Sequence, residues 1–400
     1  INNKTFSKKK FNIFFKKFEK LNIRIKYLNE IKNPKNFLNK SLEVQPNFFD
    51  IIDRPKIEVE KKILSKKIKN KNILITGGGG SIGSALCLEI LKHNPKKLYI
   101  LDNSEISLYN ILKKVESIKA LSNKKFNFIL GDCSDIDFLL QKFKLVKIDD
   151  IYHAAAYKHV GFGEENLYSI IKNNILGTKS VLELGIIKKV KNFIFVSTDK
   201  AVNPKSVLGY TKKIGECLVN IYSKKKNINK KTRFTVVRFG NVIGSSGSVI
   251  PLFLDQIKKT KPLTVTHKNV KRYFMSISEA VQLIINSSYL NGKNFNIFAL
   301  DMGDQVKIYD IASRIIRLSG YTIKNSNNIN GDIPIKIIGL KKGEKIKEEI
   351  ALGTNLKKTS NSKIMLCDEK IIPVEKLFRM LIKKVGKNKI SLNLLRKIPY

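Results

Sequence analysis

The sequence predicts an α/β protein whose core is a parallel β-sheet covered by helices on both faces, followed by a smaller second domain. Its 400 residues are enough for two or three domains. Between residues 72 and 239, short runs rich in β-branched and aromatic residues alternate with segments of helical length, the pattern of a doubly wound sheet. Beyond residue 241 the alternation loosens, and glycine and proline become more frequent, which indicates a domain with long loops.

The elements follow one another in regular order. The predicted strands cover residues 73–76, 98–101, 126–130, 151–155, 193–197 and 234–238. Helices are predicted between them, for example over residues 82–92, 106–119 and 168–187. We therefore expect a Rossmann-type domain over residues 71–240, to which residues 268–300 return. Residues 241–267 and 301–400 are expected to form the second domain.

Residues 1–70 precede this pattern as a basic helix and a linker. The first forty residues carry 12 basic and 2 acidic side chains, and apolar residues such as Phe11, Phe14, Phe18 and Leu21 recur at three- and four-residue steps. This spacing predicts a helix with one apolar and one lysine-rich face. Two uses of the helix stay open: packing on the body of the protein, or peripheral contact of residues 4–28 with an anionic membrane.

The chain carries 76 basic and 33 acidic residues, a formal net charge of +43. A polyanion partner is one explanation, because basic surfaces attract nucleic acids and anionic membranes. The lysines are scattered, however, and Lys, Asn and Ile are abundant together, as in an AT-rich coding sequence. We recognise no nucleic-acid-binding module in the sequence. We therefore expect compositional drift and no nucleic-acid partner.

The four cysteines lie far apart and form neither a metal-ligand pair nor a redox pair, so no metal site is expected. No apolar run approaches the length of a membrane span, and we recognise no secretory signal. These features predict a protein of the reducing cytoplasm, either free or at the inner face of the membrane.

Residues 73–83 read as a strand, a glycine turn and the start of a helix. Gly77, Gly80 and Gly83 lie at three-residue steps, and Ser81 and Ile82 stand at the helix start. The first glycine allows a tight turn, the second a close approach of the backbone to a pyrophosphate, and the third close packing of helix on strand. Free amides at the helix N-terminus then bind the phosphates. The segment predicts a dinucleotide site.

Residues at the ends of the next strands support this site. Asp102 ends the second strand, where a carboxylate binds the adenosine ribose hydroxyls and repels a ribose phosphate. We therefore expect NAD rather than NADP. Asp132 and Cys133 follow the third strand and are expected to border the adenine. Ala154 and Ala155 follow the fourth, where small side chains leave room for a flat cofactor.

Several longer stretches carry a specific resemblance. They are TGGGGSIGS (76–84), HAAAYKHV (153–160), NNILGT (173–178), STDKAVNP (197–204), VRFGNVIGSSGSVIPLF (237–253), RYFM (272–275), LDMGDQVKI (300–308) and GLKKGEK (339–345). Together they resemble the nucleotide-sugar 4,6-dehydratases, the polysaccharide-biosynthesis branch of the extended short-chain dehydrogenase/reductase family. The resemblance implies a UDP-sugar substrate of the UDP-N-acetylglucosamine type, a tightly held nicotinamide cofactor and a homo-oligomer. Residues 48–70 resemble the connection found in long members, so we expect a long form that lacks its membrane portion.

The chemistry that this resemblance implies needs an acid beside a base. Hydride leaves C4 of the sugar, the ketone so formed acidifies the C5 proton, a base removes that proton, and the C6 hydroxyl departs with help from an acid. The resemblance assigns the acid to Asp199 and the base to Lys200, directly after the fifth strand. Ligands of this fold bind at that edge of the sheet.

One position departs from the wider family, which uses Tyr-x-x-x-Lys to take the hydroxyl proton. Leu208 stands at the tyrosine position, and Lys212 stands at the lysine position, where the family lysine binds the cofactor ribose. On a helix Tyr210 faces away from Lys212, so we expect it to be a packing residue. Removal of the C4 hydroxyl proton then falls to Thr198, to Asp199 or to a water near Lys212, and this choice stays open.

For the substrate, the resemblance points to Lys158, Asn241, Arg272 and Lys341 around the nucleotide diphosphate. Cations and an amide suit two phosphates by charge and by hydrogen bonding. Lys341 stands where the family usually has arginine.

Three alternatives stand beside the dehydratase. A 4-epimerase on the same scaffold returns hydride to C4 and needs no acid at C6. A dehydratase that inverts C5 is a further variant on this scaffold. A non-catalytic protein that binds nucleotides or polyanions is suggested by the net charge and by Leu208.

Overall fold

The computed structural model describes residues 61–118, 125–225, 232–245, 247–290, 292–353, 355–369, 375–385 and 392–396. The predicted amphipathic helix, and with it the expected membrane contact of residues 4–28, lies outside the described residues. The chain divides into two compact units. Of the described residues, the larger unit takes those within 57–245, 275–303 and 342–400, and the smaller unit takes those within 246–274 and 304–341.

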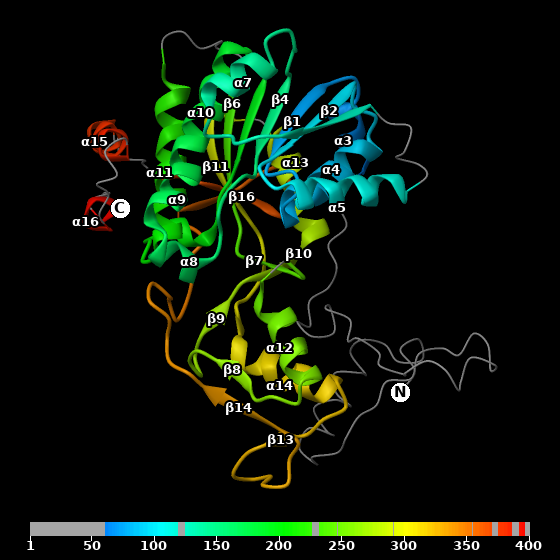
Figure 1. Ribbon diagram of the computed structural model, residues 1–400, viewed down its shortest axis with the longest axis vertical. Helices are drawn as coiled ribbons and strands as arrows, with labels where there is room; N and C mark the ends of the chain where they lie inside the picture. The colour runs from blue at the N-terminus through cyan, green and yellow to red at the C-terminus, as the bar shows by residue number, and fades with distance from the viewer. Residues whose placement is uncertain are drawn as a thin grey trace, which may run out of the picture. The chain divides into compact units, whose positions relative to one another are not determined.

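The larger unit is built on one sheet, whose nine strands in the described part of the chain run in the order β15-β16-β11-β6-β5-β4-β1-β2-β3 (Figure 1). Seven strands are parallel: β1 (Asn72–Thr76), β2 (Lys97–Asp102), β3 (Phe126–Leu130), β4 (Asp150–His153), β5 (Asn192–Val196), β6 (Arg233–Arg238) and β11 (Phe295–Leu300). The chain order reverses between β1 and β4, the switch point at which open parallel sheets bind ligands. The predicted α/β fold and its six predicted strands are confirmed.

Helices cover both faces of this sheet, with α7, α10 and α11 on one side and α4, α5 and α13 on the other (Figure 1). This is why β1 and β5 are buried along their whole length and apolar at most positions. The helices are α3 (Lys61–Ile68), α4 (Ser81–Lys92), α5 (Glu105–Glu116), α7 (Ile136–Lys142), α8 (Val160–Glu165), α9 (Leu167–Ile171), α10 (Gly177–Ile187), α11 (Val207–Ser223), α13 (Ile277–Ser287), α15 (Glu375–Val385) and α16 (Leu392–Leu395).

The helix predicted over residues 168–187 is not uniform. Between α9 and α10 the chain forms a π-helical turn, Lys172–Leu176. The wider turn buries Asn173 and Asn174, which a regular amphipathic helix would not place together on its inner face. Apolar periodicity predicts that a helix exists and does not reveal such a local widening, which is frequent at functional sites.

The end of the chain differs from the predicted second domain. The described residues within 342–400 belong to the larger unit and not to a separate domain that runs from 301 to 400. Within them β16 (Ile364–Cys367) pairs antiparallel with β11, and β15 (Leu356–Lys358) pairs with β16 at the edge of the sheet. A short apolar run predicts a strand but not the sheet that the strand joins. For this reason the predicted boundary of the second domain differs from the observed one.

The smaller unit is a compact arrangement of short elements. Helix α14 (Ile308–Leu318) buries an isoleucine-rich face against α12 (Val249–Lys258) and β8 (Leu263–Val265). Strand β14 (Ile333–Ile337) pairs in parallel with β8 and with β13 (Ile323–Lys324), and β9 (Lys271–Arg272) pairs antiparallel with β12 (Val306–Lys307). A further short pair, β7 (Asn241–Ile243) with β10 (Phe274–Ser276), belongs to the larger unit apart from Phe274.

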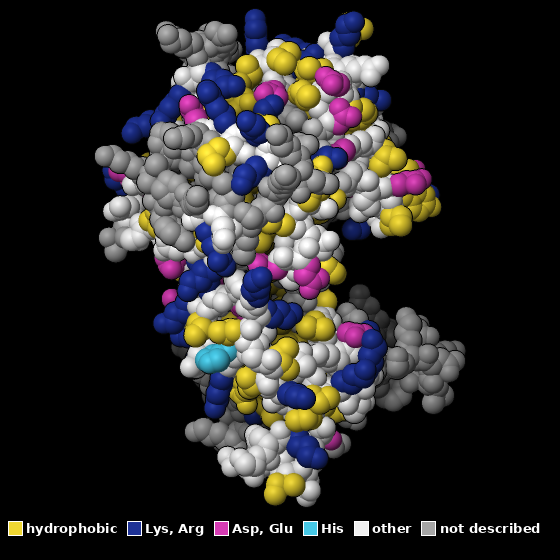
Figure 2. All heavy atoms as spheres, turned by 60° about the vertical axis from the view of Figure 1, so that its left-hand side comes forward, with side chains coloured by type: hydrophobic (Ala, Val, Ile, Leu, Met, Phe, Trp, Pro, Cys, Tyr) yellow, Lys and Arg dark blue, Asp and Glu magenta, His cyan; other side chains and the backbone are white. Residues whose placement is uncertain are grey.

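Surface charge is spread rather than gathered on the face drawn in Figure 2, where Lys and Arg side chains alternate with acidic, apolar and neutral ones. The absence of a nucleic-acid partner stays a prediction. Among the described residues, no helix combines the length and the hydropathy that crossing a bilayer requires.

Candidate active site

The glycine turn connects β1 to α4. Gly77 has a φ of +67°, and a Cβ added there would lie 2.6 Å from the Ala155 Cα, so a larger residue would be strained and would clash. At Gly83, an added Cβ would overlap the Gly77 carbonyl oxygen. Helix α4 begins at Ser81, after an N-cap glycine that carries no side chain to satisfy the first-turn amides. Dinucleotide-binding folds place the pyrophosphate of the cofactor at such a helix N-terminus.

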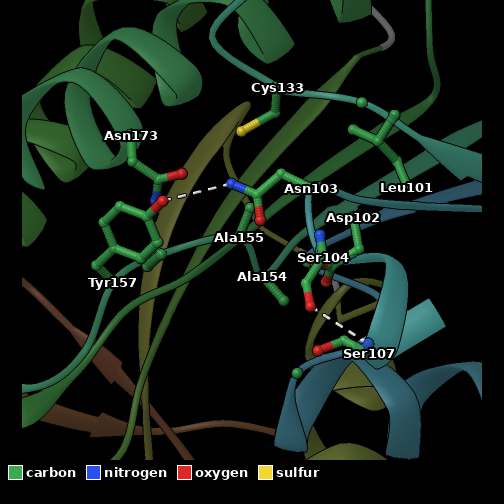
Figure 3. Close-up of a pocket in the computed structure, with 14 residues that line it drawn as sticks. Leu101, Asp102, Asn103, Ser104, Ser107, Cys133, Ala154, Ala155, Tyr157 and Asn173 are labelled. Carbon is green, nitrogen blue, oxygen red and sulfur yellow. Dashed lines mark hydrogen bonds between the residues drawn. The ribbon is translucent and has the colours of Figure 1, made fainter. Parts of the chain in front are cut away.

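A cavity of about 240 Å³ opens beside this turn, at the carboxyl ends of the strands (Figure 3). Six residues predicted to bind the cofactor line it: Gly77, Gly80, Asp102, Cys133, Ala154 and Ala155. The Asp102 carboxylate is held in place because its two oxygens accept hydrogen bonds from the amides of Gly79 (2.9 Å) and Ser104 (3.0 Å). A carboxylate has further lone pairs, which leaves acceptors for ribose hydroxyls.

The other predicted cofactor residues lie near the cavity without lining it. Ser81, Ile82 and Gly83 form the first turn of α4, and Asp132 accepts a hydrogen bond from the Ser134 amide at 2.8 Å. Lys212 on α11 is buried, and its Nζ donates to the Val196 carbonyl oxygen at 2.8 Å, at the end of β5. Burial lowers the pKa of Lys212 to about 8, although the nearby Glu216 carboxylate opposes this shift.

Sequence reasoning missed part of the lining, notably Asn103, Tyr157 and Asn173. Figure 3 shows the Asn103 amide directed at the Tyr157 hydroxyl, at 3.5 Å. Asn174, from the π-helical turn, fixes the Tyr157 backbone by accepting from its amide (2.8 Å) and donating to its carbonyl oxygen (3.1 Å). The adjacent asparagines in NNILGT were the signal for this, since neighbouring polar residues inside an apolar helix are unusual.

The predicted acid and base lie side by side. Asp199 starts a single turn of 3₁₀ helix directly after β5 and is fully buried, and Lys200 Nζ lies 2.9 Å from Asp199 Oδ1. Thr198 Oγ1 donates to the same carboxylate oxygen at 2.9 Å. The other oxygen, Asp199 Oδ2, is buried without a hydrogen-bond partner in the described part of the chain. A buried carboxylate oxygen left in this state can accept a hydrogen bond from a ligand hydroxyl.

Lys200 has two further polar neighbours. Its Nζ donates to Asn241 Oδ1 at 3.4 Å and lies 3.7 Å from Glu348 Oε1. The Lys200 side chain is 20% exposed, so it is reachable from outside, whereas Glu348 is buried. Sequence reasoning missed Glu348, which follows the GLKKGEK stretch.

Leu208 and Tyr210, on α11, both pack in the hydrophobic core of the larger unit. Neither lines the cavity described above. Tyr210 is therefore a packing residue, and Leu208 stands at the sequence position of the family tyrosine.

The four predicted substrate residues divide between the two units. Lys158, which is exposed and precedes α8, and Asn241 belong to the larger unit. Arg272 and Lys341 belong to the smaller unit. Arg272 is buried and donates from Nη1 to the Lys271 carbonyl oxygen at 2.7 Å, while Lys341 is exposed. Among the described residues, no cluster of His, Cys, Asp and Glu has the arrangement of a metal site.

Comparison with known proteins gives related sequences, some of which are matched over only part of their own length. The capsular polysaccharide biosynthesis protein CapD of Staphylococcus aureus is 41% identical over 312 residues, which are 78% of this chain and 49% of that protein. The chain thus spans about half the length of this relative. A UDP-glucose 4-epimerase of Rickettsia bellii is 34% identical over 294 residues, 73% of this chain and 81% of that protein.

Solved structures share the fold. Pen from Bacillus thuringiensis has a TM-score of 0.66 at 29% identity and covers 79% of this chain and 98% of its own. DesIV, a dTDP-glucose 4,6-dehydratase from Streptomyces venezuelae solved with NAD bound, has a TM-score of 0.58 at 18% identity and covers 70% of this chain and 87% of its own. The model of the polysaccharide biosynthesis protein family matches residues 73–369. With that match over most of its length, and with the glycine turn and the Asp199–Lys200 pair in place, the chain belongs to this family of polysaccharide biosynthesis proteins.

Proposed function

We propose that the chain is an NAD-dependent nucleotide-sugar 4,6-dehydratase, which converts a UDP-N-acetylglucosamine-type substrate into a UDP-4-keto-6-deoxy sugar. One observation carries the proposal. A buried carboxylate with one unpaired oxygen lies against a lysine amine, at the sheet edge where this fold binds its ligands. Dehydration needs an acid and a base held together over one sugar ring, and Asp199 and Lys200 supply them.

The cofactor proposal rests on the shape of the cavity. The glycine turn admits a close phosphate, helix α4 begins directly after this turn, and Asp102 offers acceptors to a ribose. A carboxylate there repels a ribose phosphate, which favours NAD over NADP. DesIV, which has the same fold, was solved with NAD. When bound, NAD accepts the C4 hydride and returns it to C6.

The chain's own residues move the protons. Asp199 Oδ2 takes the C4 hydroxyl proton, which suits its lack of a partner among the described residues. Thr198 orients this carboxylate through the hydrogen bond to Oδ1. Lys200 removes the C5 proton and later returns it to C5. Asp199 gives its proton to the departing C6 oxygen, so that the sugar loses one water overall.

We assign the diphosphate to Lys158, Asn241, Arg272 and Lys341. The proposal rests on the charge of three cations and on the amide of Asn241, which suit phosphate oxygens. It predicts that substitution of any one of them raises KM for the nucleotide sugar more than it changes kcat.

The product assay tests the proposed function. The chain is incubated with UDP-N-acetylglucosamine and NAD, and the masses of the products are measured by mass spectrometry. Dehydration lowers the mass of the sugar nucleotide by one water, and proton NMR of the product reads the configuration at C5. An unchanged mass in the presence of a folded, NAD-bound chain would refute the dehydratase.

The second candidate is a UDP-sugar 4-epimerase, which the Rickettsia bellii relative favours. The same assay separates the two, because epimerisation changes the configuration at C4 and leaves the mass unaltered. Epimerisation needs neither a base at C5 nor an acid at C6, and so the Asp199–Lys200 pair favours the dehydratase.

A further inference from the structure

Glu348 is a buried carboxylate that the acid–base pair does not explain. It is 4% exposed, and its Oε1 lies 3.7 Å from Lys200 Nζ, the same amine that contacts Asp199. Its other oxygen, Oε2, lies 3.7 Å from Lys345 Nζ. A charged group this deeply buried is costly unless it is paired, and here it is paired with two lysines.

The short segment that carries Glu348 is fixed to the loop that carries Asp199 and Lys200. Lys345 Nζ donates to the Val202 carbonyl oxygen at 2.7 Å. On the other side, the Asn203 side-chain amide donates to Glu349 Oε2 at 2.6 Å. The Glu348 carboxylate is therefore anchored by its neighbours on both sides, at a set distance from the amine.

The proposed reaction creates a need for such a group. When Lys200 removes the C5 proton it becomes an ammonium. Asp199 at that moment carries the proton that it will give to the C6 oxygen, so it is uncharged and no longer balances the lysine. A second carboxylate close to the same amine stabilises the positive charge that develops on Lys200 in this step. Such a carboxylate is effective because it is already in place before the ammonium forms.

We propose that Glu348 is a positioning residue for Lys200, which holds the amine and balances its charge while Lys200 takes the C5 proton. This inference rests on the proposed dehydratase function. It predicts a defect in the proton-abstraction step and not in the binding of the nucleotide sugar, because Glu348 acts through Lys200.

Glu348→Gln and Glu349→Gln form a matched pair for the test. The two residues are adjacent, have the same side chain and touch the same loop, but the Glu349 carboxylate is exposed and bonds Asn203. The full chain is assayed with UDP-N-acetylglucosamine and with the same sugar carrying deuterium at C5. For Glu348→Gln, we expect kcat to fall by about 10-fold or more with KM within about 2-fold, and the C5 deuterium isotope effect to rise. Glu349→Gln should match the wild type, because the glutamine carbonyl oxygen can still accept the Asn203 hydrogen bond that anchors this segment.

A third variant, Glu348→Asp, keeps the charge on a shorter side chain and should recover part of the kcat that Glu348→Gln loses. Thermal unfolding of all variants shows whether they are folded. If the wild type releases no water from the sugar, the proposed function falls and this inference with it. If the wild type dehydrates and folded Glu348→Gln keeps its kcat and isotope effect, or loses only as much as Glu349→Gln, the inference alone is wrong.

Discussion

Asp199 Oδ2 is a polar atom that folding buries and leaves without a hydrogen bond in the described part of the chain. Such an atom costs about 1–3 kcal/mol of folding free energy. Its neighbour Lys200 contacts Asp199, lies close to the side chains of Asn241 and Glu348, and remains partly exposed. At the scale of single residues, this pair combines burial, an unpaired acceptor and access, a combination that a solvated surface ion pair lacks.

Asp199→Asn and Lys200→Ala should each lower product formation by about 10²–10⁴-fold while NAD stays bound, because each removes one proton-transfer group. Product formation is measured by mass spectrometry, and bound NAD by its release on denaturation. Lys205→Ala, an exposed lysine in the same loop, serves as the control. Turnover near the wild-type rate in either variant would contradict the assigned roles.

Leu208 occupies the position of the family tyrosine and packs in the core. Because leucine transfers no protons, Leu208→Met should keep turnover and cost less than about 1.5 kcal/mol of unfolding free energy. Leu208→Ala should lose about 2–5 kcal/mol of stability through the cavity it leaves, while the folded fraction still turns over. Urea unfolding and the product assay measure the two effects. An inactive but fully stable Leu208→Met variant would point to a role beyond packing.

His153 is fully buried between two threonine hydroxyls, Thr76 (2.7 Å) and Thr178 (2.9 Å). Burial, with a smaller effect from the Lys212 charge, lowers the pKa of His153 to about 3. As the pH falls through the ordinary histidine pKa, this side chain therefore binds a proton in the unfolded chain but not in the folded chain. This contribution to stability is fully present above about pH 6.5 and is lost at about 1.4 kcal/mol per pH unit as the pH falls towards 3.

The His153→Gln variant should be less stable than the wild type at pH 7.5, since it disturbs both threonine bonds, but its stability should fall less steeply from pH 6.5 to pH 4.5. Urea unfolding at a series of pH values measures this, with His267→Gln in the smaller unit as the control. Equal slopes for His153→Gln and the wild type would show that this histidine titrates normally.

At the scale of elements, Arg238 joins three segments of the larger unit. It ends β6 with no exposed side-chain surface, and its guanidinium donates to Glu216 on α11 (2.7 and 2.8 Å) and to Glu369 after β16 (2.8 and 3.0 Å). Burial alone would raise the pKa of Glu216, but the charge and hydrogen bonds of Arg238 outweigh it and hold this pKa below its usual range. The strand that returns at the end of the chain is thus tied to the parallel core.

Glu369→Gln removes one partner from this buried network and should lower the unfolding free energy by about 3–5 kcal/mol. The neighbouring Asp368→Asn, which breaks an exposed ion pair with Lys357, should change stability little. Denaturant unfolding of the two variants side by side measures the difference. The same small effect for both would show that the buried pair is replaceable by neutral hydrogen bonds.

Element by element, the sequence predicted most of the sheet but not the details that build the site. The six strands and the helix start at Ser81 follow from apolar runs and from the glycine turn, which are local signals. The π-helical turn did not follow, because a single wider turn leaves the apolar spacing of the flanking helices almost unchanged. For this reason Asn173, which lines the cavity, was not predicted as a site residue.

At the scale of the whole molecule, the larger unit depends on residues that come after the smaller unit in the chain. Strand β16 covers the edge of β11, and Glu348 and Glu369 contribute buried carboxylates to the larger unit. Removal of residues 342–400 would expose a sheet edge. It would also remove the Glu369 partner of Arg238 and the Glu348 partner of Lys200.

A chain ended after residue 341 should therefore be insoluble or unfold at a clearly lower temperature than a chain ended after residue 396. Soluble yield and thermal unfolding by circular dichroism measure this. A shortened chain with an unchanged unfolding midpoint would mean that the larger unit is complete without β15, β16 and their flanks.

The sequence by itself determined the parallel sheet, the glycine turn and the adjacency of Asp199 and Lys200, because each of these depends on residues close together in the chain. Only the tertiary structure decided which distant groups complete them. Arg238 and Glu369 stand 131 positions apart, and Glu348 reaches Lys200 from a similarly remote segment. Apolar periodicity and motif spacing do not predict such contacts, because the contacts form only when β16 and the loops beside it fold back onto the parallel core.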